Sequence, residues 1–270
     1  MKIIAQGYPA YACTGGVPYD PALPAALLLH GAAMDHSAWQ WQSRYLAHHG
    51  FAVIAPDLPG HGRSPGTART RVEALADWAA DLLGALGREQ AFVAGHSLGS
   101  LVALDLAMRH PGRVAALALV GVSVPMPVGD AFLAAARDDD PAALEMQATW
   151  GLARHSQLAT SPVPGLVLHG ANRRLMGRAA PGVQYAGLSA CHAYAPGPEA
   201  IRAIAVPTLV VAGRRDGMTP PKAGQALARE IPGARFESLD RGHDMPGEAP
   251  REVARLLQSH FAATARPQAR

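Results

Sequence analysis

Short apolar runs alternate along the chain with longer segments in which apolar residues recur every three or four positions. Leu27, Leu28 and Leu29 form one such run, and no polar residue interrupts it. Runs of this kind are typical of strands that are buried on both faces. The expected strands lie at 25–29, 51–55, 91–95, 114–120, 207–212 and 234–239.

The segments between these runs have helical spacing. Strands that alternate with helices predict a mostly parallel sheet with helices on both faces. The first 20 residues differ, because they indicate a short hairpin with Gly15-Gly16 as its turn. The expected helices lie at about 37–49, 72–87, 98–109, 221–231 and 249–264.

Ser97 stands in Gly95-His96-Ser97-Leu98-Gly99, between an expected strand and an expected helix. A sharp strand-to-helix turn needs a positive φ at the serine and glycines on both flanks, where side chains would collide. Such a turn presents the hydroxyl at a helix N-terminus, where free N–H groups can stabilise an oxyanion. Ser97 is therefore the candidate nucleophile.

A serine nucleophile needs a base, and the base needs an acid that orients it. Asp216 follows the apolar run 207–212, and His243 follows the strand expected at 234–239. The order Ser…Asp…His, with a strand before each member, matches the arrangement of one hydrolase fold. Asp130, which comes after the strand expected at 114–120, is the alternative acid.

The interval from Pro125 to Ile204 breaks the α/β rhythm. It is rich in proline and has no convincing strand pattern, but it has helical spacing at about 129–138 and 141–155. We therefore expect residues 1–124 and 205–270 to form the core. Residues 125–204 are expected to form a helical cap over the serine, and its underside would form part of the pocket.

The chain resembles an α/β-hydrolase of the large group that carries a helical cap. The matching pieces follow the family's order from about residue 20 to residue 260: His30-Gly31-Ala32, Pro56-Asp57-Leu58-Pro59-Gly60-His61-Gly62-Arg63-Ser64, Gly95-His96-Ser97-Leu98-Gly99, Gly213-Arg214-Arg215-Asp216 and Gly242-His243. The resemblance implies that the backbone N–H groups of Ala32 and Leu98 form the oxyanion hole. It also implies that His61 shapes the structure beneath the site.

Four further residues are candidates for the pocket: His30, His36, Met146 and Trp150. His96, next to the nucleophile, is expected to serve packing. His169-Gly170 repeats the look of the oxyanion motif, but it falls in the expected cap and is interpreted as chance. No metal site or cofactor is expected, because no pattern has zinc-ligand spacing.

The composition fits a globular enzyme. The 270 residues are 49% hydrophobic and 17% charged, with a net charge of +3 and scattered basic residues, whereas a nucleic-acid surface would need them clustered. The two isolated cysteines do not indicate a disulfide framework. There is no signal-peptide pattern and no apolar run long enough to span a membrane, so a cytoplasmic location is expected. Oligomeric state is left open.

The resulting expectation is a serine hydrolase that cleaves a carboxylic ester of a small or medium, apolar substrate. A serine argues against the dehalogenases and epoxide hydrolases of the family, which by resemblance use aspartate at this position. The same triad also serves carbon–carbon bond hydrolases, lactonases, thioesterases, amidases and perhydrolases. A receptor that binds ligand without turnover is the alternative from another class.

Overall fold

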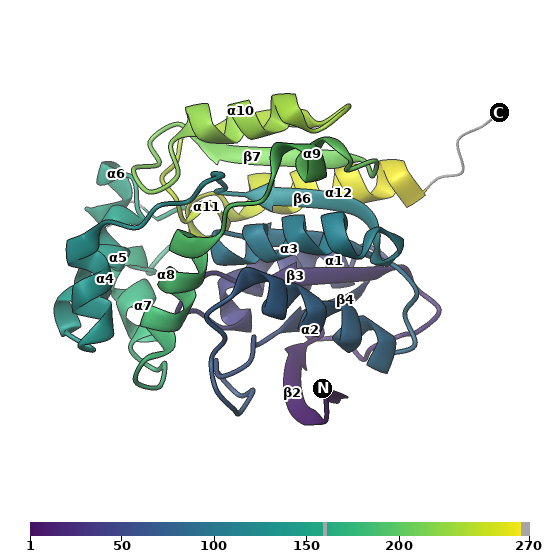
Figure 1. Ribbon diagram of the computed structural model, residues 1–270, viewed down its shortest axis with the longest axis horizontal. Helices are drawn as coiled ribbons and strands as arrows, with labels where there is room; N and C mark the ends of the chain where they lie inside the picture. The colour runs from purple at the N-terminus through teal and green to yellow at the C-terminus, as the bar shows by residue number, and fades with distance from the viewer. Residues whose placement is uncertain (159–160, 266–270) are drawn as a thin grey trace.

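The computed structural model describes residues 1–158 and 161–265, and an eight-stranded sheet forms its centre (Figure 1). The strands are β1 Lys2–Ala5, β2 Tyr8–Cys13, β3 Ala25–Leu29, β4 Ala52–Pro56, β5 Ala91–His96, β6 Val114–Val120, β7 Thr208–Gly213 and β8 Arg235–Leu239.

The order of the strands across the sheet is β1-β2-β4-β3-β5-β6-β7-β8. Strands β3 to β8 are parallel, whereas β2 pairs antiparallel with both β1 and β4. This is the mostly parallel sheet of an α/β-hydrolase fold, which confirms the fold class expected from the sequence. All six parallel strands lie within one residue of their expected bounds.

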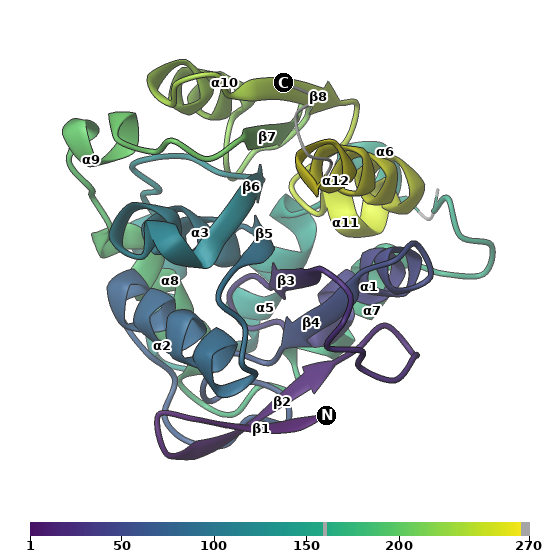
Figure 2. The same ribbon diagram turned by 90° about the vertical axis from the view of Figure 1, so that its right-hand side faces the viewer.

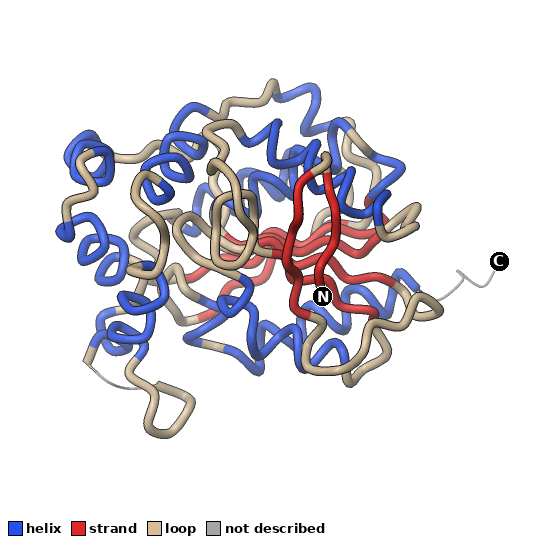
Figure 3. The backbone as a smooth tube through the Cα atoms, turned by 90° about the horizontal axis from the view of Figure 1, so that it is seen from below, coloured by secondary structure: helices blue, strands red, loops and turns tan. Residues whose placement is uncertain are grey.

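Helices cover both faces of the sheet, as Figures 2 and 3 show. One face carries α2, α3 and α10, and the other carries α1, α11 and α12. The bounds are η1 His36–Trp39, α1 Gln40–Ala47, α2 Val72–Ala85, α3 Leu98–Arg109, η2 Pro111–Arg113, α10 Pro221–Glu230, α11 Met245–Glu248 and α12 Pro250–Ala265.

The side chains of β3 divide the core into two halves. Leu27 and Leu29 pack in the cluster that contains the apolar residues of α2 and α3. Ala26 and Leu28 belong to the cluster on the opposite face, with residues of α1 and α12. Because successive strand residues point to opposite faces, a continuous apolar run is what a sheet covered on both sides requires.

The N-terminal hairpin exists, but its predicted turn was wrong. The turn is made by Gln6 and Gly7, both at positive φ (51° and 79°), between β1 and β2. Two consecutive positive φ values suit the twist of a tight hairpin. Gly15 lies beyond β2 instead, where any Cβ would overlap the backbone carbonyl of Ser43 in α1.

The segment between β6 and β7 is helical, and no strand occurs in its described residues, 125–158 and 161–204. Most of its helices gather beyond one end of the sheet in Figure 1, whereas the last of them contacts α10. The sequence predicted the first two of them and missed the other four. The helices are α4 Asp130–Arg137, α5 Pro141–Trp150, α6 Arg154–Gln157, α7 Leu168–Met176, α8 Val183–Ala193 and α9 Pro198–Arg202.

These helices share the core of the sheet. Phe132 of α4 and Leu188 of α8 pack in the same apolar cluster as α2 and α3. Within the described ranges, no helix combines the length and the apolar character needed to cross a bilayer.

Candidate active site

Ser97 lies at the turn between β5 and α3 in a strained conformation, with φ 55° and ψ −120°. The two flanking glycines are required by space. A Cβ at Gly95 would overlap the carbonyl of Gly99, and one at Gly99 would overlap the carbonyl of Leu29. The Ser97 N–H donates to the carbonyl of Val120 in β6 at 3.0 Å. The sheet thus fixes the turn, and such strain persists only where the surroundings hold it.

Asp216 and His243 come together at the same edge of the sheet, although 27 positions separate them in the sequence. Asp216 follows β7 and His243 follows β8. The His243 Nδ1–H donates to Asp216 Oδ2 at 2.8 Å. Gly121, at the end of β6, leaves room for the imidazole, because a Cβ there would lie 3.1 Å from the ring.

Thr219 completes this pair, and the sequence analysis did not consider it. Its hydroxyl donates to Asp216 Oδ2 at 2.6 Å and lies 3.0 Å from His243 Nδ1. The backbone N–H groups of Met218 and Thr219 both donate to Asp216 Oδ1 at 2.8 Å. In the sequence, the only indication of this role was that Thr219 carries a hydroxyl three residues after Asp216.

The pair perturbs the pKa of both members. Burial acts to raise the pKa of Asp216, but the charge of His243 and the donated hydrogen bonds outweigh it, and the net pKa is lowered. Burial acts to lower the pKa of His243, but the charge of Asp216 and their hydrogen bond outweigh it, and the net pKa is raised. Asp216 is therefore held as a carboxylate that stabilises a protonated imidazole.

The other ring nitrogen of His243 is free to act. Nε2 is buried and has no hydrogen-bond partner among the described residues. His243 and Ser97 both line a cavity of about 450 Å³. The structure thus brings to one cavity the serine and the histidine that the sequence singled out. Asp130, the alternative acid, begins α4 and is exposed.

Ala32 and Leu98, the expected oxyanion donors, both lie close to this serine. Ala32 lines the cavity, and Leu98 is the first residue of α3, where backbone N–H groups have no acceptor within the helix. A Cβ at Gly31 would lie 3.3 Å from the Cβ of Ser97, so the loop after β3 runs directly against the candidate nucleophile. Gly187 of α8 presses on the same loop, since its Cβ would lie 2.8 Å from that of Ala32.

Histidines form the floor beneath the site. His30 is fully buried, accepts from the Leu58 N–H through Nε2 at 3.0 Å and donates from Nδ1 to the carbonyl of Gly31 at 2.8 Å. His96 donates from Nε2 to the backbone carbonyl of His243 at 2.9 Å. Burial lowers the pKa of His96 to about 3 and that of His61 to about 3, so both rings are neutral.

The cavity wall combines apolar and polar groups and comes from both the sheet edge and the helical segment. Trp150 belongs to it, and its ring meets that of Phe132 edge-on at 5.6 Å. Of the four pocket candidates, His30, His36 and Met146 are not among the residues that line this cavity. The lining residues are Ala32, Ser97, Met126, Pro127, Val128, Gly129, Phe132, Gln147, Trp150, Leu152, Gln157, Leu188, Cys191, Arg215, Gly217, Met218, Thr219 and His243.

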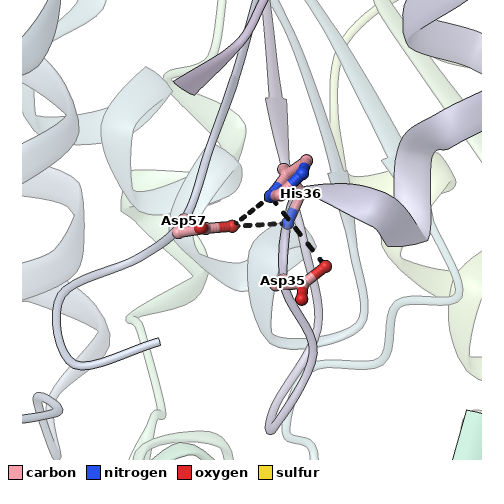
Figure 4. A group of neighbouring side chains, drawn as sticks. All are labelled: Asp35, His36 and Asp57. Atoms are coloured by element: carbon pink, nitrogen blue, oxygen red, sulfur yellow. Dashed lines mark hydrogen bonds and ion pairs between the residues drawn. The ribbon is translucent and has the colours of Figure 1, made fainter. Parts of the chain in front are cut away.

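His36 takes part in a different cluster, with Asp35 and Asp57 (Figure 4). Asp57 Oδ1 accepts from the backbone N–H and from Nδ1 of His36, both at 2.7 Å. Asp35 Oδ2 accepts from Arg178 at 2.8 Å. Protein donors thus occupy the oxygens that a cation would need. We therefore interpret the cluster as a brace for the loop that follows Ala32.

Buried acids tie the His243 loop to the helical segment. Glu248 accepts from Gly242 N–H at 2.9 Å and from the hydroxyl of Ser156 at 2.6 Å. Asp244 accepts from Asn172 at 2.9 Å, and burial raises its pKa to about 6. These acids could not be identified from the sequence, because their partners in the helical segment, Ser156 and Asn172, lie more than 70 positions away.

Comparison with known proteins decides the family. A sequence profile described as the alpha/beta hydrolase family matches residues 26–256. The chain belongs to the α/β-hydrolase family. As an α/β-hydrolase it is 32% identical to a pimeloyl-[acyl-carrier protein] methyl ester esterase of Aromatoleum aromaticum, over 87% of this chain and 97% of that protein. It is 31% identical to a 2-hydroxymuconate semialdehyde hydrolase of Pseudomonas putida, over 95% and 88%.

Solved structures support the fold of this α/β-hydrolase. A thermophilic esterase from Thermogutta terrifontis superposes with a TM-score of 0.83 at 25% identity, covering 98% of this chain and 99% of that one. The enol-lactonase from Burkholderia xenovorans gives a TM-score of 0.85 at 23% identity, covering 97% and 100%. The family and these relatives identify the chain as an enzyme of the hydrolase class.

Proposed function

We propose that this α/β-hydrolase cleaves carboxylic esters of small or medium, apolar substrates through an acyl-enzyme on Ser97. His243 Nε2 accepts the serine proton while Oγ attacks the ester carbonyl, and Asp216 holds the imidazole in the required tautomer. The Ala32 and Leu98 N–H groups stabilise the oxyanion. His243 then protonates the leaving alcohol, and a water molecule repeats the cycle and releases the acid.

The single observation that carries this proposal is the state of His243. Its Nδ1 is bound to a buried carboxylate at 2.8 Å, while Nε2 has no partner within the described residues. The same cavity is lined by a serine at a positive-φ turn. A base with one nitrogen oriented and the other free, beside a hydroxyl at a helix N-terminus, suits proton transfer from that hydroxyl.

The substrate class follows from the charge of the wall. Among the described lining residues, Arg215 and His243 are those whose side chains can carry a charge. Arg215 already donates two hydrogen bonds to Asp240, at 2.8 and 3.0 Å. The remaining wall is rich in apolar and aromatic groups. An uncharged, apolar substrate avoids the cost of burying an unpaired charge there.

We further propose that residues 125–204 act as the cap of this site. Phe132, Trp150 and Leu188 come from that segment, whereas Ser97 and His243 come from the sheet edge. The cavity therefore lies between the two. The expectations of no nucleic-acid partner, no cofactor and a cytoplasmic location stay predictions.

A fluorophosphonate probe and a panel of p-nitrophenyl esters test the proposal. We expect the probe to label wild type at Ser97 alone, and Ser97→Ala to fold normally but lose at least about a thousandfold in turnover. Labelling at another residue with Ser97 unreacted would contradict the nucleophile.

The same panel, set beside a ring-opened diketone substrate, separates the alternatives. Repeated release of p-nitrophenol supports an esterase. Ligand-induced stabilisation against heat without product release would indicate a receptor. Faster cleavage of a ring-opened diketone than of any ester would indicate a carbon–carbon bond hydrolase.

A further inference from the structure

We propose that Gln147, on helix α5, is a positioning residue that holds the oxyanion loop in its active conformation. The inference rests on the proposed function, because it assigns a role toward Ala32, one of the two proposed oxyanion donors. Gln147 itself comes from the helical segment and not from the sheet edge.

Gln147 is in direct contact with the oxyanion loop. Gln147 Nε2 donates to the backbone carbonyl of Ala32 at 2.9 Å, across 115 positions of sequence. That carbonyl belongs to the peptide that leads into Ala33, a non-glycine residue with φ 59°. A side chain at positive φ persists only where the surroundings oppose the flip that would relieve it. The Gln147 bond opposes that flip.

Gln184 fixes the orientation of the Gln147 side-chain amide. Gln184 of α8 donates from Nε2 to Gln147 Oε1 at 2.8 Å and to the carbonyl of Ala143 at 3.2 Å. Because Ala143 offers an acceptor, the Gln184 amide must present its NH₂ group there, and Gln147 must receive it through oxygen. The NH₂ end of Gln147 is therefore the end that faces Ala32.

Ala32 is held in place by a second helix as well. Ala32 is also confined from the side of α8, where Gly187 leaves no room for a Cβ. Two helices of the proposed cap thus fix the residue whose N–H is to receive the developing negative charge, one by a hydrogen bond and one by close packing. Preorganised donors stabilise a transition state because they need no reorganisation when the charge develops.

The test compares Gln147→Met with Thr149→Val as a matched control. Thr149 lies on the same helix, but its hydroxyl bonds to Glu145 and His169, and it does not line the cavity. We expect Gln147→Met to lower kcat about 10- to 100-fold, below the effect of deleting a direct donor, with KM within about threefold. The control should keep wild-type kcat and KM.

An alkylboronic acid gives a second readout, because its adduct with Ser97 is tetrahedral and anionic. We expect its inhibition constant for Gln147→Met to rise by the same factor by which kcat/KM falls. Gln147→Glu adds a pH signature, since only the protonated carboxyl can donate to Ala32. Its activity relative to wild type at the same pH should rise as the pH falls from 8 to 5.

Three results would overturn the inference. They are a raised KM with unchanged kcat, an unchanged boronate constant, or a Gln147→Glu activity ratio that does not depend on pH. The wild-type measurements separate this failure from failure of the proposed function. A wild-type protein that neither hydrolyses esters nor reacts at Ser97 overturns both, whereas normal wild-type chemistry with an unaffected Gln147→Met overturns the inference alone.

Discussion

Two aspartate–histidine pairs stand at the same edge of this sheet, and they have nearly the same geometry. His243 Nδ1 lies 2.8 Å from Asp216, and His36 Nδ1 lies 2.7 Å from Asp57. Both aspartates follow parallel strands and are buried. Among the described residues, His243 of the first pair lines a cavity together with Ser97, whereas His36 and Asp57 do not line it. A bonded pair is therefore not in itself a catalytic site.

The difference lies in what surrounds each pair. The backbone N–H of His36 also donates to Asp57, and the N–H of Arg63 donates to it at 2.8 Å. Asp57 therefore binds the backbone of two separate loops. Asp216 receives its N–H groups from its own turn and leaves His243 free at Nε2. In the proposed mechanism, Asp57 thus serves the architecture of a loop, and Asp216 orients a base.

The largest effect that separates the pairs is expected from Asp216→Asn. An asparagine favours the wrong imidazole tautomer, so kcat should fall by about 10⁴-fold, as in other triads. Steady-state kinetics with a p-nitrophenyl ester measures this loss. Asp57→Asn should lower kcat by less than about tenfold, and Asp130→Asn, at an exposed position, should be mild. A greater loss in Asp130→Asn than in Asp216→Asn would show that the acid is misplaced.

A smaller effect is expected from Asp57→Asn on stability. Asp57 accepts two hydrogen bonds from His36 through Oδ1 and one from the Arg63 N–H through Oδ2. Asparagine keeps one oxygen acceptor and replaces the other with an NH₂ group, so it cannot accept the His36 bonds and the Arg63 bond together. Losing acceptors for buried donors should lower the free energy of unfolding by about 1–3 kcal/mol. Chemical denaturation measures it. An unchanged midpoint and slope would contradict the role of Asp57 as a brace.

The smallest effect is a displacement of the pH profile. His243 must be neutral to accept the serine proton, and Asp216 raises its pKa above the ordinary value. The rate constant kcat/KM should therefore rise with pH to an alkaline plateau, with a midpoint above about 6.5. A midpoint below that value, or a rate that falls between pH 6 and 8 in a folded protein, would contradict His243 as the base.

The sequence predicted the parallel strands β3 to β7 closely because both faces of each are buried, which leaves an apolar run such as Leu27 to Leu29. It missed α7 and α8, in which only part of the helix surface is buried and small or polar residues such as Gly170 and Ser189 interrupt the apolar spacing. The hairpin turn was misplaced because Gly15 and Gly16 form a separate turn beyond β2, where Gly15 also packs against α1. Local patterns do not distinguish these two uses of glycine.

The site shows the same division. Ser97, Asp216 and His243 could be singled out from chain order and from the strands before them. His36 could not be placed, because its partner Asp57 comes from another strand. Gln147, Thr219 and Arg215 were missed, since their positions depend on how helices and loops pack. Chain order thus predicts candidate residues for the site, and packing determines what surrounds them.

The buried acids of the His243 loop have a consequence for protein engineering. Glu248 bonds to Gly242 and Ser156, and the N–H of Asp244 donates to the carbonyl of Gly151 at 2.7 Å. The conformation of the loop that carries His243 thus depends on its hydrogen bonds to residues 151–156. In a chimera that receives a foreign segment between β6 and β7, residues 151–156 no longer match the loop that carries His243. Grafts between relatives should therefore exchange 151–156 and 242–248 as one module.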